Sequence, residues 1–376
     1  MKCLRFIVIF ALLGWLFTSP LLAQEDIKVG SSIDLSGPLK VLGGNVLTGI
    51  EAYLNRVNQN GGINGKKVKF VVYDDRYSPA LTVKNVKRLI LNDRVVALLG
   101  IFGTPPTLAV MGIVEAMKVP LIGPITGNGA LYTHLNRYIF TVLPSYKDEV
   151  NALVKQAVDD GHRKLAVIYK KDAYGWTCFR YAVDALKSLG VDSVIKGRVD
   201  SPQKVEEVLL KIKQAKPDAL LVVATPEVSR PLVAAMLKHG YFLPVYANMW
   251  SGFDGVLKGL DPHDLGRFKK VVVSRMFPML SEDYPLIKDF KEDIAKYFPD
   301  KSPDITQMPG YVVARVFVEI LRRAKSFDSQ GIVKAAESIK NLDIGLPEKI
   351  SYGPEDHVGF SRIYLYSFNG KYSRIK

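Results

Sequence analysis

Residues 27–73 read IKVGSSIDLSGPLKVLGGNVLTGIEAYLNRVNQNGGINGKKVKFVVY, and the pattern of apolar residues changes twice within them. The segment Ile27 to Ile33 is apolar enough for a buried strand, and the turn residues at 34–38 predict a loop after it. Apolar side chains then recur at helical spacing, at Val46, Ile50, Tyr53, Leu54 and Val57. The segment Asn60 to Gly62 predicts the end of that helix, and Val68 to Tyr73 predicts a second strand. The chain therefore begins with a β-α-β unit.

The same alternation continues along the chain. Further strands are predicted at Val95 to Leu99, Pro120 to Ile122, Leu165 to Tyr169, Ser193 to Gly197 and Ala219 to Ala224. Further helices are predicted at Leu81 to Leu91, Pro105 to Met117, Val150 to Val158, Trp176 to Leu189 and Val205 to Ile212. Apolar strands separated by amphipathic helices indicate parallel sheets that are covered on both faces. A second series starts after Pro144, so the predicted fold class is α/β with two doubly wound lobes.

The composition fits a globular protein of two or three domains. The chain has 376 residues, of which 48% are hydrophobic and 23% are charged, and it has 2 Cys. These fractions exclude disordered, collagen-like and disulfide-rich chains. The 51 Lys and Arg residues outnumber the 37 Asp and Glu residues, but the basic residues are scattered rather than clustered. We therefore expect a solvated basic surface and no nucleic-acid partner, with Lys40, Lys170 and Lys171 as the cations that would favour an anionic solute.

The first 23 residues have the pattern of a secretory signal peptide. A basic segment at 2–5 precedes an apolar stretch at 6–17, and Ala23 is a suitable cleavage position. The apolar stretch is shorter than the roughly 20 residues that a membrane-spanning helix needs, so an uncleaved anchor is the less favoured alternative. Cleavage would remove Cys3 and leave Cys178 alone, so no intramolecular disulfide is expected in the exported chain.

Motifs of common enzymes and cofactor sites are missing from the sequence. It contains no G-x-S-x-G, no Rossmann G-x-G-x-x-G and no Walker A motif. The five histidines have no spacing suited to shared metal ligation, and Asp74-Asp75 is better explained as a turn than as an acid/base pair. We therefore expect no catalytic residue, no metal site and no cofactor. An exported hydrolase is the alternative, although it lacks a nucleophile motif.

Polar, glycine-rich loops follow two strands of the first series. Ligands of open α/β sheets bind at the carboxyl ends of the strands. After Leu99 the chain reads GIFGTPPT, in which Thr104 is suited to cap a helix and Gly103 lets another group approach the backbone. The next strand is followed by a second such loop, from Gly123 to Gly129. Two adjacent helix starts of this kind are suited to hold one carboxylate, and ordinary helix capping is the alternative explanation.

Several short motifs form an ordered set along the chain. They are Leu35 to Lys40 with Gly43, Asn58 to Gly65, Tyr73-Asp74-Asp75, Gly103-Thr104-Pro105, Pro124 to Gly127, Asp172 to Gly175 and Gly310-Tyr311. In this order they resemble the leucine/isoleucine/valine-binding family of periplasmic solute-binding proteins. The resemblance implies a non-catalytic protein of the periplasm. Its partners would be a small-molecule ligand and the membrane permease subunits of an ABC importer.

The resemblance also implies the type I periplasmic-binding fold, in which two lobes are joined by three crossovers and the ligand lies in the cleft between them. The crossovers are expected near Leu143 to Tyr146, Val273 to Pro278 and Pro347 to Ser351. The corresponding division is a signal peptide at 1–23, a first lobe at 24–143 plus 277–349, and a second lobe at 144–276 plus 350–376. Closure of the lobes would bury the ligand.

Ligand contacts are assigned by the same resemblance. In the first lobe they are Gly103, Thr104, Ile125, Thr126 and Gly127, with Ser36, Lys40 and Tyr311 beside the cleft. In the second lobe they are Tyr174, which would close over the ligand, and Thr225, with Trp250 and Phe253 as an apolar wall.

One departure from the family concerns the ligand. Members that bind amino acids hold the ligand ammonium with an acidic residue of the second lobe, near the segment that is 248–254 here. No acid stands unambiguously at that place, and Asp172 and Asp254 are the candidates. A branched-chain or other apolar amino acid is the leading expectation for the ligand. The alternatives are an aromatic or aliphatic carboxylate or amide, or a ligand sensor for a membrane receptor on the same fold.

Overall fold

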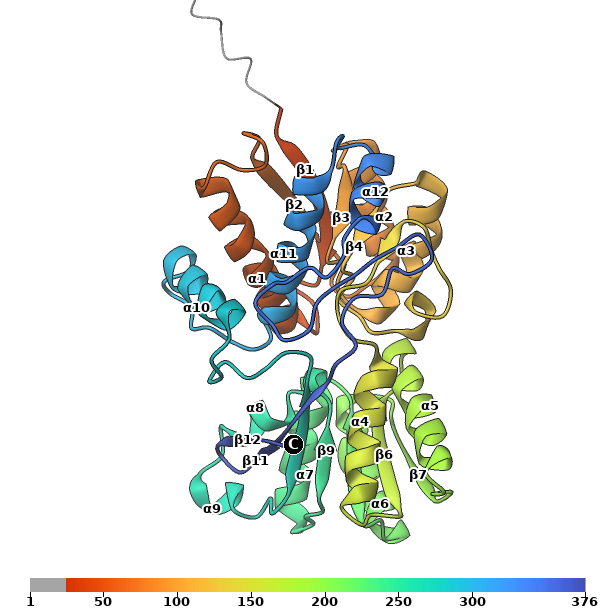
Figure 1. Ribbon diagram of the computed structural model, residues 1–376. Helices are drawn as coiled ribbons and strands as arrows, with labels where there is room; N and C mark the ends of the chain where they lie inside the picture. Colours follow the sequence, from red (N-terminus) through yellow and green to blue (C-terminus); the bar gives the residue numbers. More distant parts are fainter. Residues whose placement is uncertain (1–24, 376) are drawn as a thin grey trace, which may run out of the picture.

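The computed structural model describes residues 25–375 and divides them into two stacked α/β lobes (Figure 1). The first lobe is built on a 5-stranded parallel sheet in the order β2-β1-β3-β4-β5. Its strands are β1 (Ile27–Ile33), β2 (Val68–Asp74), β3 (Ala97–Leu99), β4 (Leu121–Ile122) and β5 (Ile139–Phe140). The predicted signal peptide lies outside the described residues.

The second lobe is built on a 7-stranded sheet in the order β12-β11-β10-β9-β8-β6-β7. Its strands are β6 (Leu165–Lys170), β7 (Val194–Val199), β8 (Ala219–Val223), β9 (Val245–Ala247), β10 (Val271–Arg275), β11 (Tyr364–Phe368) and β12 (Tyr372–Arg374). Strands β6 to β10 are parallel, whereas β11 and β12 form an antiparallel edge beside β10. Strands β9 to β12 are not among those that the sequence pattern predicted.

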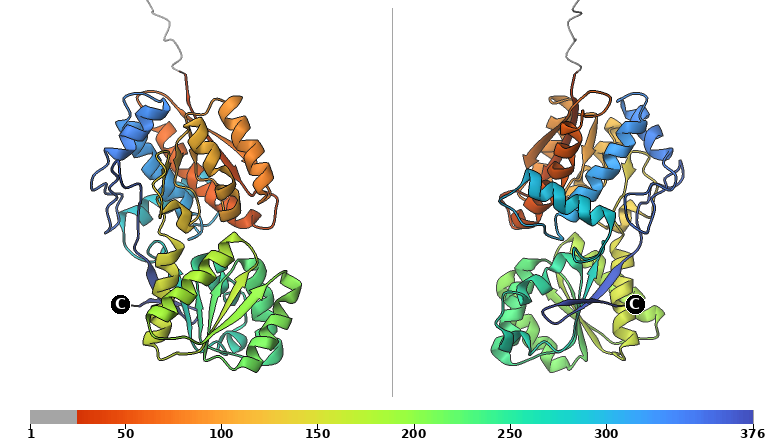
Figure 2. Two further views of the ribbon diagram at one scale, coloured as in Figure 1. Left: turned by 90° about the vertical axis from the view of Figure 1, so that its right-hand side faces the viewer. Right: turned by 60° about the vertical axis from the view of Figure 1, so that its left-hand side comes forward.

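Helices cover both faces of each sheet (Figure 2). Those of the first lobe are α1 (Lys40–Gln59), α2 (Pro79–Leu91), α3 (Thr104–Met117), α10 (Pro285–Tyr297), α11 (Met308–Arg323) and α12 (Ser329–Glu337). Those of the second lobe are α4 (Tyr146–Asp159), α5 (Ala173–Ser188), α6 (Val205–Ala215), α7 (Pro226–His239), α8 (Phe253–Leu257) and α9 (Pro262–Leu265). Short 3₁₀ helices occur at Gly129–Leu131, Pro202–Lys204 and Met249–Ser251. No helix within residues 25–375 is long and apolar enough to cross a bilayer.

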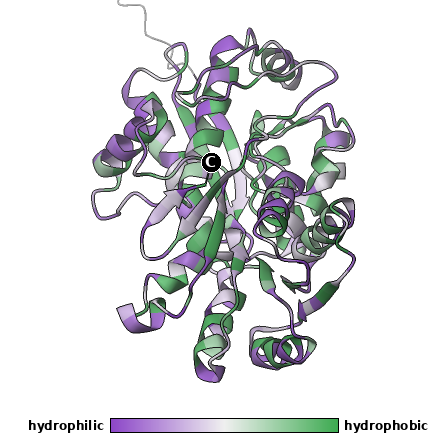
Figure 3. Cartoon of the chain, turned by 60° about the horizontal axis from the view of Figure 1, so that its bottom comes forward, coloured by the Kyte–Doolittle hydropathy of each residue, from purple (hydrophilic) through white to green (hydrophobic). Residues whose placement is uncertain are grey.

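Hydrophobic and hydrophilic residues alternate along the helices, as in helices that bury one face (Figure 3). A second-lobe core lies on one side of its sheet, around Leu220, Leu232 and Phe253. A larger buried cluster begins in the first lobe and continues into α4 and α5 of the second, where it includes Tyr146 and Tyr174. The apolar packing is therefore continuous from one lobe to the other.

The chain passes between the lobes at the connections from β5 to α4, from β10 to α10 and from the first lobe to β11 (Figure 1). The last of these differs from the crossover expected at Pro347 to Ser351. The Tyr352 hydroxyl donates to the Thr141 carbonyl at 2.7 Å, and the His357 ring stacks on Phe140 with the ring centroids 3.8 Å apart. These buried contacts keep the chain on the first lobe as far as His357, so the third passage lies between that residue and β11.

Candidate functional site

A small cavity lies between the lobes, mainly at residues that follow strands β1, β3 and β4 of the first lobe and β6, β8 and β9 of the second. It is lined by Leu39, Leu42, Tyr77, Phe102, Gly103, Ile125, Tyr146, Tyr174, Thr225 and Trp250. Its volume is about 20 Å³, which is room for roughly one water molecule. The lobes are therefore closed on each other, and they must separate to admit a larger solute.

A groove at the outer edge of this cavity is much wider, with a volume of about 220 Å³. We call it the mouth groove, and it is lined by Pro38, Leu39, Lys40, Val41, Leu42, Pro226, Glu227 and Arg230. Its first wall is the loop before α1 with the start of that helix, and its second wall is the start of α7. The mouth groove and the cavity share Leu39 and Leu42, so the two spaces adjoin.

Hydroxyl groups from neighbouring strand ends meet on the first-lobe side. The Thr104 Oγ1 lies 2.7 Å from the Thr126 Oγ1 and 3.3 Å from the Tyr146 hydroxyl. All three side chains are buried, and burial raises the pKa of Tyr146, so its phenol remains a proton donor. The Gly103 amide donates to the Ile125 carbonyl at 3.1 Å and ties the two loops together. Hydroxyl donors at the start of α3 are suited to a carboxylate.

Aromatic rings connect this region with the second lobe. The ring centroids of Tyr146 and Tyr174 are 5.0 Å apart, and those of Phe102 and Trp250 are 6.5 Å apart. The Tyr174 hydroxyl is already engaged, because it donates to the Ala224 carbonyl at 3.1 Å. The Trp250 indole Nε1, in contrast, is buried and has no hydrogen-bond partner within residues 25–375. It is therefore an unsatisfied donor on a residue that lines the cavity.

Glu149 is fully buried behind the second-lobe wall of the cavity. Its carboxylate accepts hydrogen bonds from the Ser274 hydroxyl at 2.7 Å and from the Met249 amide at 2.9 Å, and it lies 3.4 Å from the Asn248 Nδ2. Burial raises the pKa of Glu149, although these hydrogen bonds act in the opposite direction. Glu149 is not among the residues that line the cavity, and its hydrogen bond from the Met249 amide supports the loop that carries Trp250.

Asp254, one of the two candidates for an ammonium partner, is paired inside the second lobe. Its carboxylate contacts the Arg275 guanidinium and the Tyr372 hydroxyl, and both charged side chains are buried. Burial alone would raise the pKa of Asp254, but the positive charge of Arg275 lowers it below its ordinary value. The charge of Asp254 is thus compensated away from the cavity, which it does not line.

Asp172, the other candidate, belongs to a partly exposed group that we call the edge cluster: Lys170, Asp172 and Glu227. The Lys170 Nζ contacts the Glu227 carboxylate and lies 3.6 Å from the Asp172 Oδ2. Asp172 also caps α5, where its Oδ1 accepts from the Gly175 amide at 2.9 Å. Burial raises the pKa of Asp172, against the lowering effect of these partners. The Thr225 hydroxyl donates to Glu227 at 3.4 Å and links the cluster to the cavity.

The structure brings most of the predicted contact residues together. Those that line the cavity are Gly103, Ile125, Tyr174, Thr225 and Trp250, and Lys40 lines the mouth groove. Thr104 and Thr126 adjoin the cavity through the hydroxyl of Tyr146, and the Gly127 carbonyl accepts from the Tyr146 amide at 2.8 Å.

Ser36, Phe253 and Tyr311 line neither the cavity nor the mouth groove, contrary to the expectation from the sequence. The Ser36 hydroxyl donates to Asp74 at 2.5 Å on the exposed side of its loop. Phe253 lies in the second-lobe core, because α8 turns it away from the cleft. Tyr311 is buried within the first lobe, where its hydroxyl donates to Asp293 at 2.7 Å. Phe253 and Tyr311 pack inside their lobes and Ser36 bonds to Asp74, so none of the three is at the cavity.

Further lining residues were missed, namely Leu39, Leu42, Tyr77, Phe102 and Tyr146. Phe102 and Leu39 lie within motifs that the sequence analysis identified, so both residues could have been predicted to line the cavity. Tyr77 was not predictable in this way. Tyr77 and Arg76 both have left-handed backbones, with φ of 60° and 52°, and the Tyr77 ring lies over Gly103 so closely that a Cβ at Gly103 would overlap it. Only a turn with two consecutive residues of this kind brings the ring there.

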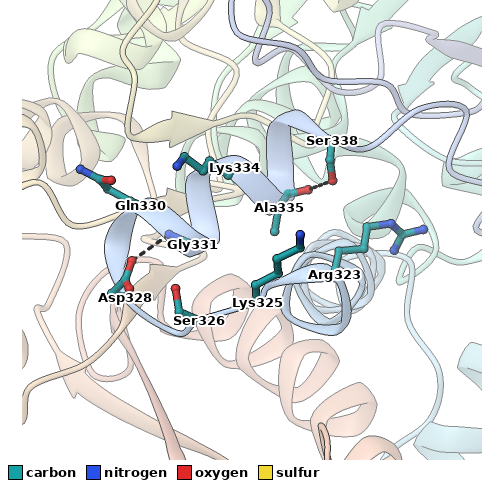
Figure 4. A pocket seen from close by; sticks show the side chains of 9 residues that line it. All are labelled: Arg323, Lys325, Ser326, Asp328, Gln330, Gly331, Lys334, Ala335 and Ser338. Atoms are coloured by element: carbon teal, nitrogen blue, oxygen red, sulfur yellow. Dashed lines mark hydrogen bonds between the residues drawn. The ribbon is translucent and has the colours of Figure 1, made fainter.

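A larger hollow of about 580 Å³ lies elsewhere, on the outer surface of the first lobe beside α11 and α12 (Figure 4). It is lined by Arg323, Lys325, Ser326, Asp328, Gln330, Gly331, Lys334, Ala335 and Ser338. Asp328 caps α12 by accepting from the Gly331 amide at 2.8 Å. Since one lobe alone forms this hollow, away from the strand ends, it is not part of the candidate site. In the described part of the chain, no group of three or more His, Cys, Asp and Glu side chains is arranged to hold a metal ion.

Comparison with known proteins gives one consistent result. A family model described as "Periplasmic binding protein" matches residues 26–372. A curated relative, the Leu/Ile/Val-binding protein homolog 7 of Brucella suis biovar 1 (strain 1330), is 23% identical over 339 residues, which cover 84% of this chain and 82% of the relative.

Two solved structures are similar over nearly their whole length. A possible leucine/isoleucine/valine-binding protein from Rhodopirellula baltica SH 1 has a TM-score of 0.87 and 26% identity, covering 96% of this chain and 98% of that one. A branched chain amino acid ABC transporter protein from Thermus thermophilus, solved with bound valine, has a TM-score of 0.81 and 20% identity, covering 94% of this chain and 96% of that one. The likeness therefore extends to the relative arrangement of both lobes.

Proposed function

The chain belongs to the periplasmic binding protein family, and from this premise we propose that it is an exported solute-binding protein of an ABC importer. It captures a small solute in the periplasm and presents it to the membrane permease subunits. The proteins of this family bind substrates for transporters, and we propose that this chain likewise acts by binding, without turnover.

The observation that carries this proposal is the cavity between the lobes. Both lobes contribute strand-end residues to its wall, so a solute held there would contact both and would favour the closed arrangement. Two of the three connections between the lobes lie side by side, since the Phe360 amide donates to the Val142 carbonyl at 3.0 Å. Such neighbouring connections are suited to a hinge, and closure about a hinge gives the permease a surface that depends on the bound solute.

The chemistry of the cavity supports a small ligand with a carboxylate and an apolar body. The hydroxyls of Thr104, Thr126 and Tyr146 and the N-terminus of α3 are suited to the carboxylate. Leu39, Phe102 and other apolar lining residues are suited to the body. Apolar amino acids and amine-free acids both have these two parts, and the names of the Brucella and Thermus relatives support an apolar side chain.

A binding experiment on the chain without residues 1–23 tests this function. Leucine, valine, phenylalanine and amine-free apolar acids are titrated by calorimetry, and small-angle scattering follows the shape. We expect saturable binding of one ligand per chain and a decrease in the radius of gyration, because the solute stabilises the closed lobes. Apolar amines without a carboxylate are the control and should not bind. Failure of every carboxylate to bind would contradict the proposed function.

A further inference from the structure

Among residues 25–375, those that line the cavity and the mouth groove offer no carboxylate that is free to pair with a ligand ammonium. The residues that line the cavity include no acidic side chain. In the mouth groove, the acidic side chain is Glu227, and it contacts Lys170 of the edge cluster. Lys40 and Arg230 also line the groove, so its walls carry more positive than negative charge.

The acids behind the second-lobe wall are also engaged. Asp254 is paired with Arg275, and the carboxylate of Glu149, which is not among the cavity-lining residues, accepts from the Ser274 hydroxyl, the Met249 amide and the Asn248 side chain. An ammonium in the cavity would therefore meet neutral acceptors among the lining residues. Neutral groups do not repay the cost of removing a full positive charge from water, so such a ligand is disfavoured.

For a carboxylate, in contrast, hydrogen-bond donors are present on both sides of the cavity. On the first-lobe side are the N-terminus of α3 and the hydroxyls of Thr104 and Thr126. On the second-lobe side is the indole Nε1 of Trp250, which is buried without a partner among the described residues. An unpartnered buried donor is costly, and a bound carboxylate would remove that cost.

The mouth groove supplies room for a tail. Its walls are mostly apolar, formed by Pro38, Leu39, Val41, Leu42 and Pro226. Val41 is 65% exposed, so it presents an apolar surface to solvent at the groove. The groove has about 220 Å³ of space and adjoins the cavity at Leu39 and Leu42. An apolar chain that starts at the cavity can therefore continue along the groove toward solvent.

Building on the proposed function, we propose that the ligand is an amine-free apolar monocarboxylate whose carboxylate is held at Thr104, Thr126 and Trp250 and whose tail lies in the mouth groove. The hydrogen-bond donors favour a ligand with a carboxylate, and the shortage of free carboxylates in the site disfavours the corresponding amino acid. The mouth groove then favours ligands with a longer apolar tail.

Matched pairs of ligands test the amine-free character. Calorimetric titration compares 4-methylpentanoate with leucine and 3-phenylpropanoate with phenylalanine, which differ only in the amino group. We expect the amine-free acid of each pair to bind about tenfold more tightly or better, because it avoids burying the ammonium. Equal or tighter binding of the amino acids would overturn this inference and leave the proposed function intact. If neither member of either pair binds, the proposed function fails as well.

A series of straight-chain acids tests the tail. From butanoate to hexanoate to octanoate, affinity should rise roughly threefold to fourfold for each methylene that enters the mouth groove. Val41→Asp should remove much of this rise, so the ratio of the octanoate affinity to the butanoate affinity should fall. Leu91→Asp is the matched control, because Leu91 is 63% exposed on α2 and lies outside both spaces. A chain-length series that is flat in the parent protein, or equally steep in Val41→Asp, would overturn the assignment of the tail.

Discussion

The hydroxyl oxygens of Thr104 and Thr126 lie 2.7 Å apart, although the two residues are separated by 22 positions in the chain. They meet because β3 and β4 are parallel neighbours, so the loops after them leave the sheet at the same edge. In a buried site, one hydroxyl of the pair must donate to the other, and both are within reach of the Tyr146 phenol. A bound carboxylate would replace this internal hydrogen bond with two charge-assisted ones.

The variants Thr104→Val and Thr126→Val are expected to weaken binding of a carboxylate ligand. Each removes one hydroxyl donor at nearly constant volume, and a hydrogen bond to a charged group contributes about 1.5–3 kcal/mol, so affinity should fall at least tenfold. Calorimetric titration measures the change. Thr107→Val is the matched control on α3, because the Thr107 hydroxyl donates to the Ile101 carbonyl at 3.4 Å. A loss of affinity in the Thr107 variant as large as that in the other two would contradict the assignment.

Trp250→Phe is expected to weaken ligand binding about tenfold through loss of the indole donor. The phenyl ring keeps an aromatic surface against Phe102, so stability should change little. Trp176→Phe is the control, because Trp176 is 47% exposed and does not line the cavity. The same control leaves Trp250 as the fluorescent reporter in the described chain, and its emission should shift on binding. Unchanged affinity in Trp250→Phe would show that the indole donor does not face the ligand.

Asp254→Asn is expected to destabilise the second lobe without changing ligand affinity. The substitution leaves the buried Arg275 charge without its partner, which costs about 3–5 kcal/mol in the free energy of unfolding. Chemical denaturation measures the loss, and titration of the folded variant measures the affinity. Asp254→Leu combined with Arg275→Met should recover much of the stability, since no buried charge remains. A specific loss of amino-acid binding in a stably folded variant would instead identify Asp254 as a ligand contact.

Gly103→Ala and Gly112→Ala are expected to have opposite effects. Gly103 has a φ of 94°, and a Cβ there would overlap the Tyr77 ring, so the variant should lose about 1–3 kcal/mol of stability. Gly112 lies in α3 with open space around the added Cβ, so its variant should gain roughly 0.5–1 kcal/mol. Thermal unfolding distinguishes the two. Equal changes would mean that Tyr77 does not occupy the space over Gly103.

Glu149→Gln is expected to change the pH dependence of stability. Burial raises the folded-state pKa of Glu149 above its ordinary value of 4.5, so the folded protein binds the proton more tightly than the unfolded chain does. The parent protein therefore loses stability from this group as the pH rises from that value through the folded-state pKa. Glutamine cannot ionise, so the melting temperature of the variant minus that of the parent should increase between pH 4 and pH 7. A difference that is independent of pH would contradict the raised pKa.

Local sequence patterns were sufficient to predict much of the fold and some of the residues at the cleft. The segments that become β1, β6 and β8 were predicted because a strand buried on both faces is largely apolar. The loops at Gly103-Thr104 and Ile125 to Gly127 were predicted to adjoin, because parallel strands present their carboxyl ends at one edge. The edge strands β11 and β12 were not predicted, since their place in the sheet depends on a distant segment returning to β10.

The sequence alone indicated two α/β lobes, because strand and helix periodicities are properties of consecutive residues. It also indicated which loops would meet, because that follows from parallel strand order. The tertiary structure alone showed which acids are paired, because Asp254 on α8 meets Arg275 on β10 and Glu227 on α7 meets Lys170 on β6. Only the tertiary structure showed that Tyr77 lines the cavity and that Phe253 lies in the second-lobe core. The pairing of charges and the direction of side chains depend on contacts between residues far apart in the chain. The preference for a particular solute depends on both.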